Sequence, residues 1–87
     1  MQILSPAVQD SLVWLTDHLE QVLDETVQLC QIPAPTFEEA ARAVYVAERM
    51  RAIGLHDVQV DDIHNVTGIL NGAGPGPTTL VAAHIDT

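Results

Sequence analysis

Residues suited to a buried face recur at spacings of three and four in the first thirty positions. They are Leu12, Leu15, Leu19, Val22 and Thr26. This spacing predicts a single long amphipathic helix whose stripe packs against a core. Ser5 before Pro6 is typical of an N-cap followed by the first helical residue. The prolines of residues 32–35 are expected to end the helix, because a residue that precedes proline avoids the helical conformation.

A second helix is predicted between Thr36 and Gly54. Thr36 followed three residues later by Glu39 has the form of a capping box, in which each side chain bonds the other residue's backbone N–H. The residues expected to be buried are Phe37, Ala40, Ala41, Val44, Ala47 and Met50. Gly54 is expected to end the helix in the left-handed conformation, with Leu55 folding back towards Met50.

Beyond the second helix the hydrophobic period changes from about 3.6 residues to two. Val58 and Val60 alternate with polar neighbours, which predicts a half-buried strand. Residues 61–65 predict a turn, and residues 66–70 predict a second strand. The two strands are therefore expected to pair as a hairpin.

The last part of the chain is expected to enter the interior of a sheet. Residues 71–77 are rich in glycine and proline and predict a loop. The nearly continuous apolar run within residues 79–87 predicts a strand covered on both faces. Such a strand needs neighbours, so we expect the natural protein to continue beyond Thr87. The predicted fold class is α/β: two helices, a hairpin and the first buried strand of a mixed sheet. Residues 1–87 would form the N-terminal part of one domain, with no second domain present.

The composition and net charge of the chain limit the kinds of molecule that it is expected to bind. The 87 residues include 12 acidic and three basic ones, for a formal net charge of −9. This charge disfavours nucleic acid and anionic membrane surfaces, which attract Lys and Arg. No apolar run approaches the roughly 20 residues of a membrane span. The single cysteine, Cys30, excludes an internal disulfide, and its place on the apolar stripe predicts an inert core thiol. These features favour a cytoplasmic protein.

The strongest candidate for chemistry is His84 together with Asp86. On a strand, residues two apart direct their side chains to the same face, with backbones about 7 Å apart. The pair stands at the carboxyl end of the predicted strand, where open α/β sheets place their ligands. A neutral imidazole can bind a metal ion, and a neighbouring carboxylate can fix its orientation and tautomer. The alternative is a structural histidine, hydrogen-bonded near a sheet edge.

A second group of titratable residues lies around the predicted hairpin. It consists of His56, Asp57, Asp61, Asp62 and His64. These residues could hold a divalent cation, but the pattern is more typical of a solvated turn, which we expect here. The glycines of residues 72–77 match neither the dinucleotide-binding nor the P-loop spacing, and they lead into a strand instead of a helix.

Four segments, taken in order, carry a resemblance to a known family. They are QIPAPTFEE at residues 31–39, MRAIGL at 50–55, NVTG at 65–68 and TLVAAHIDT at 79–87. Their order and spacing resemble the start of the dizinc exopeptidase and deacylase family. That family includes peptidase T, carboxypeptidase G, aminoacylase, acetylornithine deacetylase and succinyl-diaminopimelate desuccinylase. The resemblance covers about residues 20–87. Thr87 makes the ending more similar to the peptidase T and carboxypeptidase G branches.

The resemblance implies an activity and a role for each member of the pair. It implies that His84 ligates one of two zinc ions, and that Asp86 has the catalytic role of steering this ligand and the metal-bridging group. Cobalt or manganese could replace zinc. The implied reaction is the hydrolysis of short peptides or N-acyl amino acids by metal-activated water. Many members have glycine where this chain has Ala83 and His64, and neither difference should prevent metal binding.

The resemblance also implies that most of the site is absent from these residues. The family's bridging Asp, Glu pair, further carboxylate and final His have no counterparts here, whereas a zinc site needs three or four ligands. We therefore expect the 87 residues alone to bind zinc weakly and to be inactive.

The alternative to a metallohydrolase is a non-catalytic interaction module. An unpaired strand at residues 79–87 could dock onto a partner by β-augmentation, or onto a second copy to give a homo-oligomer. A third interpretation, an acidic metal-buffering protein, depends on the His- and Asp-rich residues 56–64 alone.

Overall fold

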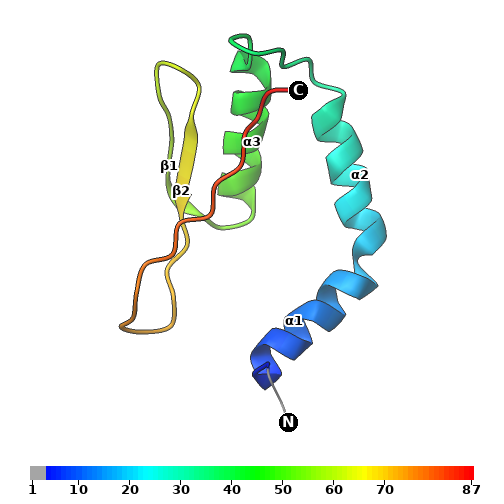
Figure 1. Cartoon of the computed structure of the whole chain (residues 1–87), viewed down its shortest axis with the longest axis vertical. Helices are drawn as coiled ribbons and strands as arrows, with labels where there is room; N and C mark the ends of the chain where they lie inside the picture. Colours follow the sequence, from blue (N-terminus) through cyan, green and yellow to red (C-terminus); the bar gives the residue numbers. More distant parts are fainter. Residues whose placement is uncertain (1–3) are drawn as a thin grey trace. The chain divides into compact units, whose positions relative to one another are not determined.

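The computed structural model describes residues 4–87, and the chain divides into two units, Met1–Gln31 and Ile32–Thr87. The described residues form three helices and one two-stranded sheet (Figure 1). The elements are α1 (Pro6–Asp17), α2 (Leu19–Cys30), α3 (Ala40–Ala52), β1 (His56–Val60) and β2 (Val66–Ile69). The mixed α/β content is as predicted. None of these helices has the length and apolar character needed to cross a membrane.

The single long helix predicted for the first unit is instead two helices that meet at His18. Ser5 caps α1 as predicted, because its hydroxyl accepts a hydrogen bond from the Val8 amide at 3.3 Å. At the junction, His18 leaves the helical conformation with φ −113° and ψ 18°. Its Nδ1 lies 2.7 Å from the carbonyl oxygen of Trp14, and its ring stacks on the Trp14 ring with centroids 4.0 Å apart. A side chain that bonds a nearby backbone carbonyl competes with the helical hydrogen bonds.

The apolar stripe of the first unit is not packed against a core. Among the described residues of α1 and α2, none is buried. The predicted core positions Leu12, Leu15, Leu19 and Val22 are all exposed. Cys30 is exposed as well, so the prediction of a core thiol is wrong. Two consecutive helices joined at a single residue cannot cover each other's apolar faces, and the stripe therefore remains open within its own unit.

Helix α3 begins at Ala40, four residues later than predicted, and the capping box does not form. Glu39 occupies the N-cap position without a side-chain cap bond. Its carboxylate instead accepts a hydrogen bond from the Phe37 amide at 2.8 Å. Phe37 takes a left-handed conformation, with φ 69°. The Thr36 hydroxyl donates to the Asp86 carboxylate, and Thr36 lies four residues before the first residue of the helix, too far to cap it.

The end of α3 follows the prediction. Gly54 has φ 104°, which a residue without a side chain adopts at little cost. The Gly54 amide donates to the Arg51 carbonyl at 3.2 Å, and the Leu55 amide donates to the Met50 carbonyl at 3.0 Å. These two bonds define a Schellman motif, which satisfies the last carbonyls of the helix.

The buried face of α3 agrees with the predicted one at Ala47 and Met50 and differs from it in the first half of the helix. Ala43 and Ala47 are buried and Met50 is half-buried, whereas Phe37 is 91% exposed. The predicted core positions Ala40, Ala41 and Val44 are also exposed. The observed face packs on the hairpin, and its closest approach is at Gly68. A Cβ there would lie 3.0 Å from Leu55 Cδ2 and 3.2 Å from Met50 Sδ, so glycine makes room for the end of α3.

Strands β1 and β2 pair antiparallel, as predicted, with Val60 opposite Val66 and Gln59 opposite Thr67. The register shifts between His56 and Gln59. The connecting turn is closed by Asp61, whose carboxylate accepts hydrogen bonds from the amides of Ile63 and Asn65 and from the Asn65 side chain, at 2.8–3.0 Å.

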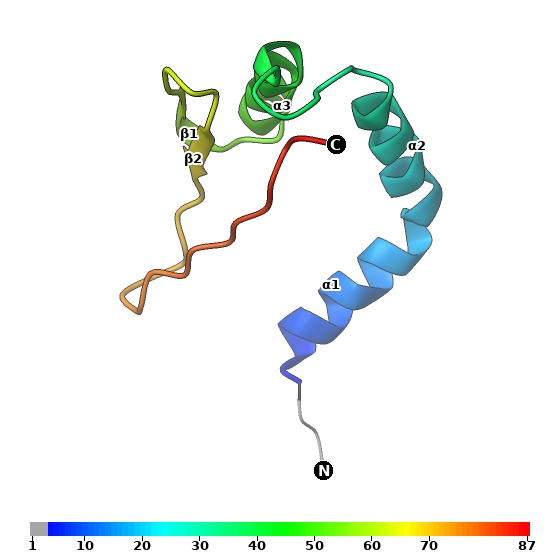
Figure 2. The same cartoon turned by 45° about the horizontal axis from the view of Figure 1, so that its top comes forward.

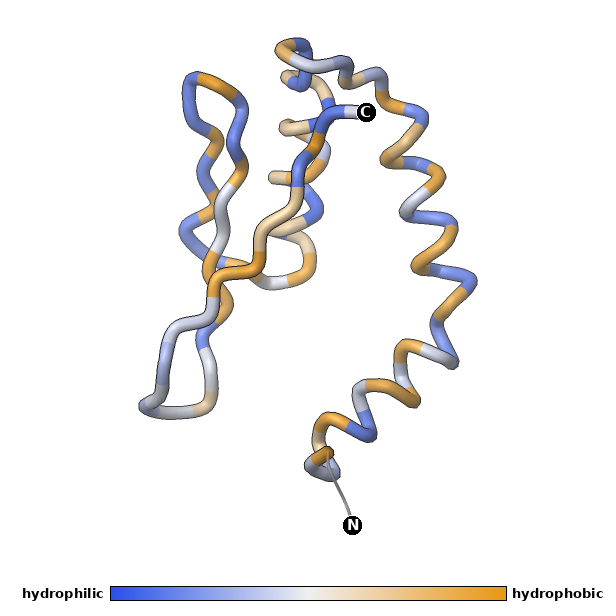
Figure 3. The backbone as a smooth tube through the Cα atoms, viewed as in Figure 1, coloured by the Kyte–Doolittle hydropathy of each residue, from blue (hydrophilic) through white to orange (hydrophobic). Residues whose placement is uncertain are grey.

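The buried strand predicted for residues 79–87 is absent. This segment forms no sheet ladder, and Leu80 and Val81 are 88% and 89% exposed. Figure 2 shows the segment running apart from β1 and β2, and Figure 3 shows the hydrophobic residues along it. A strand forms only where its backbone groups pair with a neighbouring strand, and this segment pairs with neither β1 nor β2. The segment is attached at its end, where the Thr87 amide donates to the Ala34 carbonyl at 2.9 Å.

The turn predicts a pH dependence for the hairpin. Hydrogen bonds from Asn65 and Ile63 hold the pKa of Asp61 below its usual value. A carboxyl with a lowered folded-state pKa stabilises the fold above its unfolded-state pKa, near 4, and this contribution is lost as the pH falls through the folded-state pKa. We expect the β1 and β2 amides to lose exchange protection over this acidic range. NMR hydrogen exchange would measure it.

The control for this prediction is a substitution of Asp62, which carries the neighbouring carboxyl group. Asp61→Asn should remove the acid-induced loss of protection, because an amide does not titrate, whereas Asp62→Asn should leave it intact. An unchanged acid response in Asp61→Asn would contradict the assignment of the effect to Asp61.

Candidate functional site

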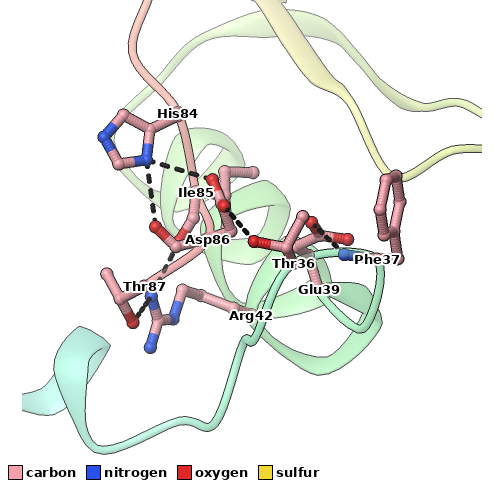
Figure 4. Close-up of polar contacts among 8 residues, drawn as sticks. All are labelled: Thr36, Phe37, Glu39, Arg42, His84, Ile85, Asp86 and Thr87. Carbon is pink, nitrogen blue, oxygen red and sulfur yellow. Dashed lines mark hydrogen bonds and ion pairs between the residues drawn. The ribbon is translucent and has the colours of Figure 1, made fainter.

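Two segments far apart in the sequence meet at the start of α3. The residues that precede this helix, 32–36, lie against the last four residues of the chain, 84–87, and Arg42 on α3 bonds to both (Figure 4). All these residues belong to the second unit. Both segments contain motifs that the sequence singled out, and their meeting places His84 and Asp86 on a defined support.

His84 and Asp86 contact each other, although the strand on which they were predicted to share a face does not form. The His84 Nδ1 atom lies 2.9 Å from the Asp86 carbonyl oxygen and 3.1 Å from Asp86 Oδ1. Both partners are acceptors, so the neutral imidazole carries its proton on Nδ1 and its lone pair on Nε2. The His84 side chain is 82% exposed, whereas that of Asp86 is 33% exposed. The ring is therefore held from one edge and open to solvent at the other.

The Asp86 carboxylate is held by a second group. The Thr36 hydroxyl donates to Asp86 Oδ2 at 2.7 Å, so the two carboxylate oxygens bind two different residues. The Thr36 hydrogen bond lowers the pKa of Asp86, His84 lowers it further, and partial burial opposes both. Asp86 is therefore ionised at neutral pH, which suits an acceptor for an imidazole N–H.

Arg42 lies beneath the pair and is 3% exposed. Its Nε and Nη2 donate to the Ile32 carbonyl at 3.0 and 2.5 Å. Its Nη1 donates to the Ile85 carbonyl at 2.7 Å and to the Thr87 hydroxyl at 2.8 Å. Sequence reasoning did not identify Arg42 or the bond between Thr36 and Asp86. The available signal was an arginine between two alanines, Ala41 and Ala43, on a helix expected to be buried on one side.

The second group of candidate residues does not assemble. His56 Nδ1 lies 3.3 Å from Asp57 Oδ2, and both side chains are exposed. Asp61 is committed to its turn. Within residues 4–87, no three His, Cys, Asp or Glu side chains lie close enough together to hold a metal ion. His84 and His56 are thus each a single exposed imidazole beside a carboxylate, which is one metal ligand and not a complete site.

Comparison with known proteins does not assign the chain to a family. No family model matches the chain. No solved structure matches it either.

The contact between Thr36 and Asp86 predicts the effect of one substitution. Thr36→Val removes the hydroxyl and keeps the shape of the side chain, so the pKa of Asp86 should rise towards its ordinary value. The pKa is measurable from the pH dependence of the Asp86 carboxyl resonance by NMR. Thr79→Val, which changes an exposed hydroxyl, is the control and should leave this pKa unchanged. An unchanged value in Thr36→Val would mean that the hydrogen bond does not persist in solution.

Proposed function

We propose that this chain is the N-terminal portion of a zinc-dependent hydrolase, to which it contributes one metal ligand, His84, and an orienting carboxylate, Asp86. One observation carries the proposal: Nδ1 of His84 donates to Asp86, and the exposed ring keeps its lone pair on Nε2. Histidines that ligate metals commonly donate their other ring N–H to a carboxylate or carbonyl in this way.

The proposed division of labour follows from the contacts. His84 offers Nε2 to the metal. Asp86 fixes the tautomer and direction of the ring, and Thr36 fixes the carboxylate of Asp86. The metal, when bound, would polarise the scissile carbonyl and lower the pKa of its bound water. In line with the family resemblance, the proposed substrates are short peptides or N-acyl amino acids, and the remaining ligands come from residues outside this sequence.

The first test uses the 87-residue chain and zinc alone. One imidazole is too few ligands for tight binding, so titration calorimetry should give a dissociation constant weaker than about 1 μM, which corresponds to about 8 kcal/mol. His84→Ala should lower the measured zinc binding by the contribution of one weak site. His56→Ala is a matched control, because His56 is also exposed and paired with a carboxylate, Asp57. Submicromolar zinc binding that His84→Ala abolishes would contradict the need for ligands from elsewhere.

The second test uses the whole product of the reading frame that encodes the chain. If the frame continues and supplies the family's further Asp, Glu pair, carboxylate and late His, the purified product should contain zinc and hydrolyse short peptides or N-acyl amino acids. His84→Ala should lower zinc content and activity together, whereas His56→Ala should lower neither. Zinc content unaffected by His84→Ala, or a frame that stops at Thr87, would overturn the proposal.

A second candidate function is favoured by the exposure of residues 79–83. Leu80 and Val81 are almost fully exposed, and their segment is not paired in a sheet. Exposed extended segments with free backbone groups can pair with another chain, so we propose as the alternative an interaction module that works by β-augmentation. A second copy of this chain is the simplest partner to test.

Sedimentation or light scattering separates the two candidates. Strand pairing should give a concentration-dependent dimer that survives a chelator and is weakened by Val81→Pro, because proline cannot donate to a ladder. Ala73→Pro, in the preceding loop, is the control. A monomer at all concentrations would eliminate self-pairing. An oligomer that requires metal and is lost in His84→Ala would instead indicate a metal site completed between chains.

A further inference from the structure

We infer that Arg42 is the positioning residue of the His84 and Asp86 pair. It contacts neither side chain. It acts through the backbone of Ile85, the residue between them, and through Thr87, the residue after them. The meaning of this role for metal binding rests on the proposed function, whereas the role itself can be tested without a metal.

Burial makes the Arg42 contacts obligatory. The guanidinium is almost completely removed from solvent, and a buried charge is costly unless hydrogen bonds satisfy it. Its bonds go to neutral oxygens on both sides of the site: the Ile32 carbonyl before α3, and the Ile85 carbonyl and Thr87 hydroxyl after His84. Moving the last residues away would leave buried donors unmet, so the guanidinium and the segment hold each other in place.

The bond to Ile85 fixes the direction of the pair. The Ile85 carbonyl belongs to the peptide unit that leads into Asp86, and a planar peptide turns as one body. Anchoring its oxygen on Arg42 Nη1 therefore sets how the backbone enters Asp86. The Asp86 carbonyl and carboxylate are the two acceptors of His84 Nδ1.

The geometry requires arginine and not merely a positive charge. The planar guanidinium directs three nitrogens towards acceptors that belong to two different segments. A lysine ammonium places all its donors on one nitrogen, so it cannot reproduce the fork that bridges Ile32 and Ile85. Arg42→Lys thus keeps the charge and removes the bridge.

The test is the tautomer of His84 in the metal-free 87-residue chain, measured by nitrogen NMR at a fixed pH at which the imidazole is neutral. The wild-type ring should be mainly Nδ1-protonated. In Arg42→Lys it should change to the Nε2-protonated form that exposed histidines favour, while the β1 and β2 resonances remain in place. Arg51→Lys, an exposed arginine on the same helix, is the matched control and should leave the tautomer unchanged. An unchanged tautomer in Arg42→Lys with an intact hairpin would overturn the inference.

A second measurement covers the case in which Arg42→Lys disrupts α3. In the wild-type chain, the Arg42 Nε–H should exchange with solvent about tenfold or more slowly than the Arg51 Nε–H, because a buried, bonded proton exchanges only after local opening. Equal exchange rates would overturn the inference without any variant.

The whole product of the reading frame separates the two proposals. If His84→Ala leaves zinc content unchanged, the proposed function fails, whereas the tautomer result for Arg42 still stands. If His84→Ala removes zinc but Arg42→Lys changes neither tautomer nor zinc content, the inference about Arg42 fails alone. Zinc loss in both variants, with the tautomer change in Arg42→Lys, supports both.

Discussion

The candidate site depends on one buried guanidinium. Arg42 joins the residues before α3 to the last residues of the chain, which are separated from it by up to 45 positions. Without this bridge, the end of the chain would keep the bond from Thr87 to Ala34 and the one from Thr36 to Asp86. The bond from Thr36 to Asp86 joins exposed side chains, where water competes for hydrogen bonds. Arg42 adds buried hydrogen bonds to both segments and so holds the site in place.

The elements that could be predicted are those with local causes. The hairpin follows from alternation within β1 and β2, and the end of α3 follows from Gly54. The break between α1 and α2 could not be predicted from periodicity, because the stripe continues across His18, where the ring bonds the Trp14 carbonyl. Residues 79–87 were expected to be a strand on the strength of their apolar run. A strand, however, depends on neighbours that a composition does not supply.

The candidate site also has one part that could be predicted from the sequence and one part that could not. The proximity of His84 and Asp86 could be predicted because they are two residues apart, although the strand assumed for them is absent. Their support could not, because the bonds from Thr36 and Arg42 span 50 and 43 positions. The capping pattern at Thr36 even indicated a different partner for its hydroxyl. Local sequence rules pair a hydroxyl with a backbone group nearby in the sequence. In the structure, the Thr36 hydroxyl instead bonds the distant carboxylate of Asp86.

The stacking of His18 on Trp14 has a practical consequence. The chain contains one tryptophan and one tyrosine, and they fall in different units: Trp14 on α1, and Tyr45 on α3. Each unit thus has its own intrinsic fluorophore. Tryptophan emission follows the helical junction of the first unit, since the imidazole lies directly on the indole, and tyrosine emission follows the packing of the second. Unfolding of the two units can therefore be recorded separately in the unlabelled protein, and energy transfer from the tyrosine to the tryptophan reports on the distance between them.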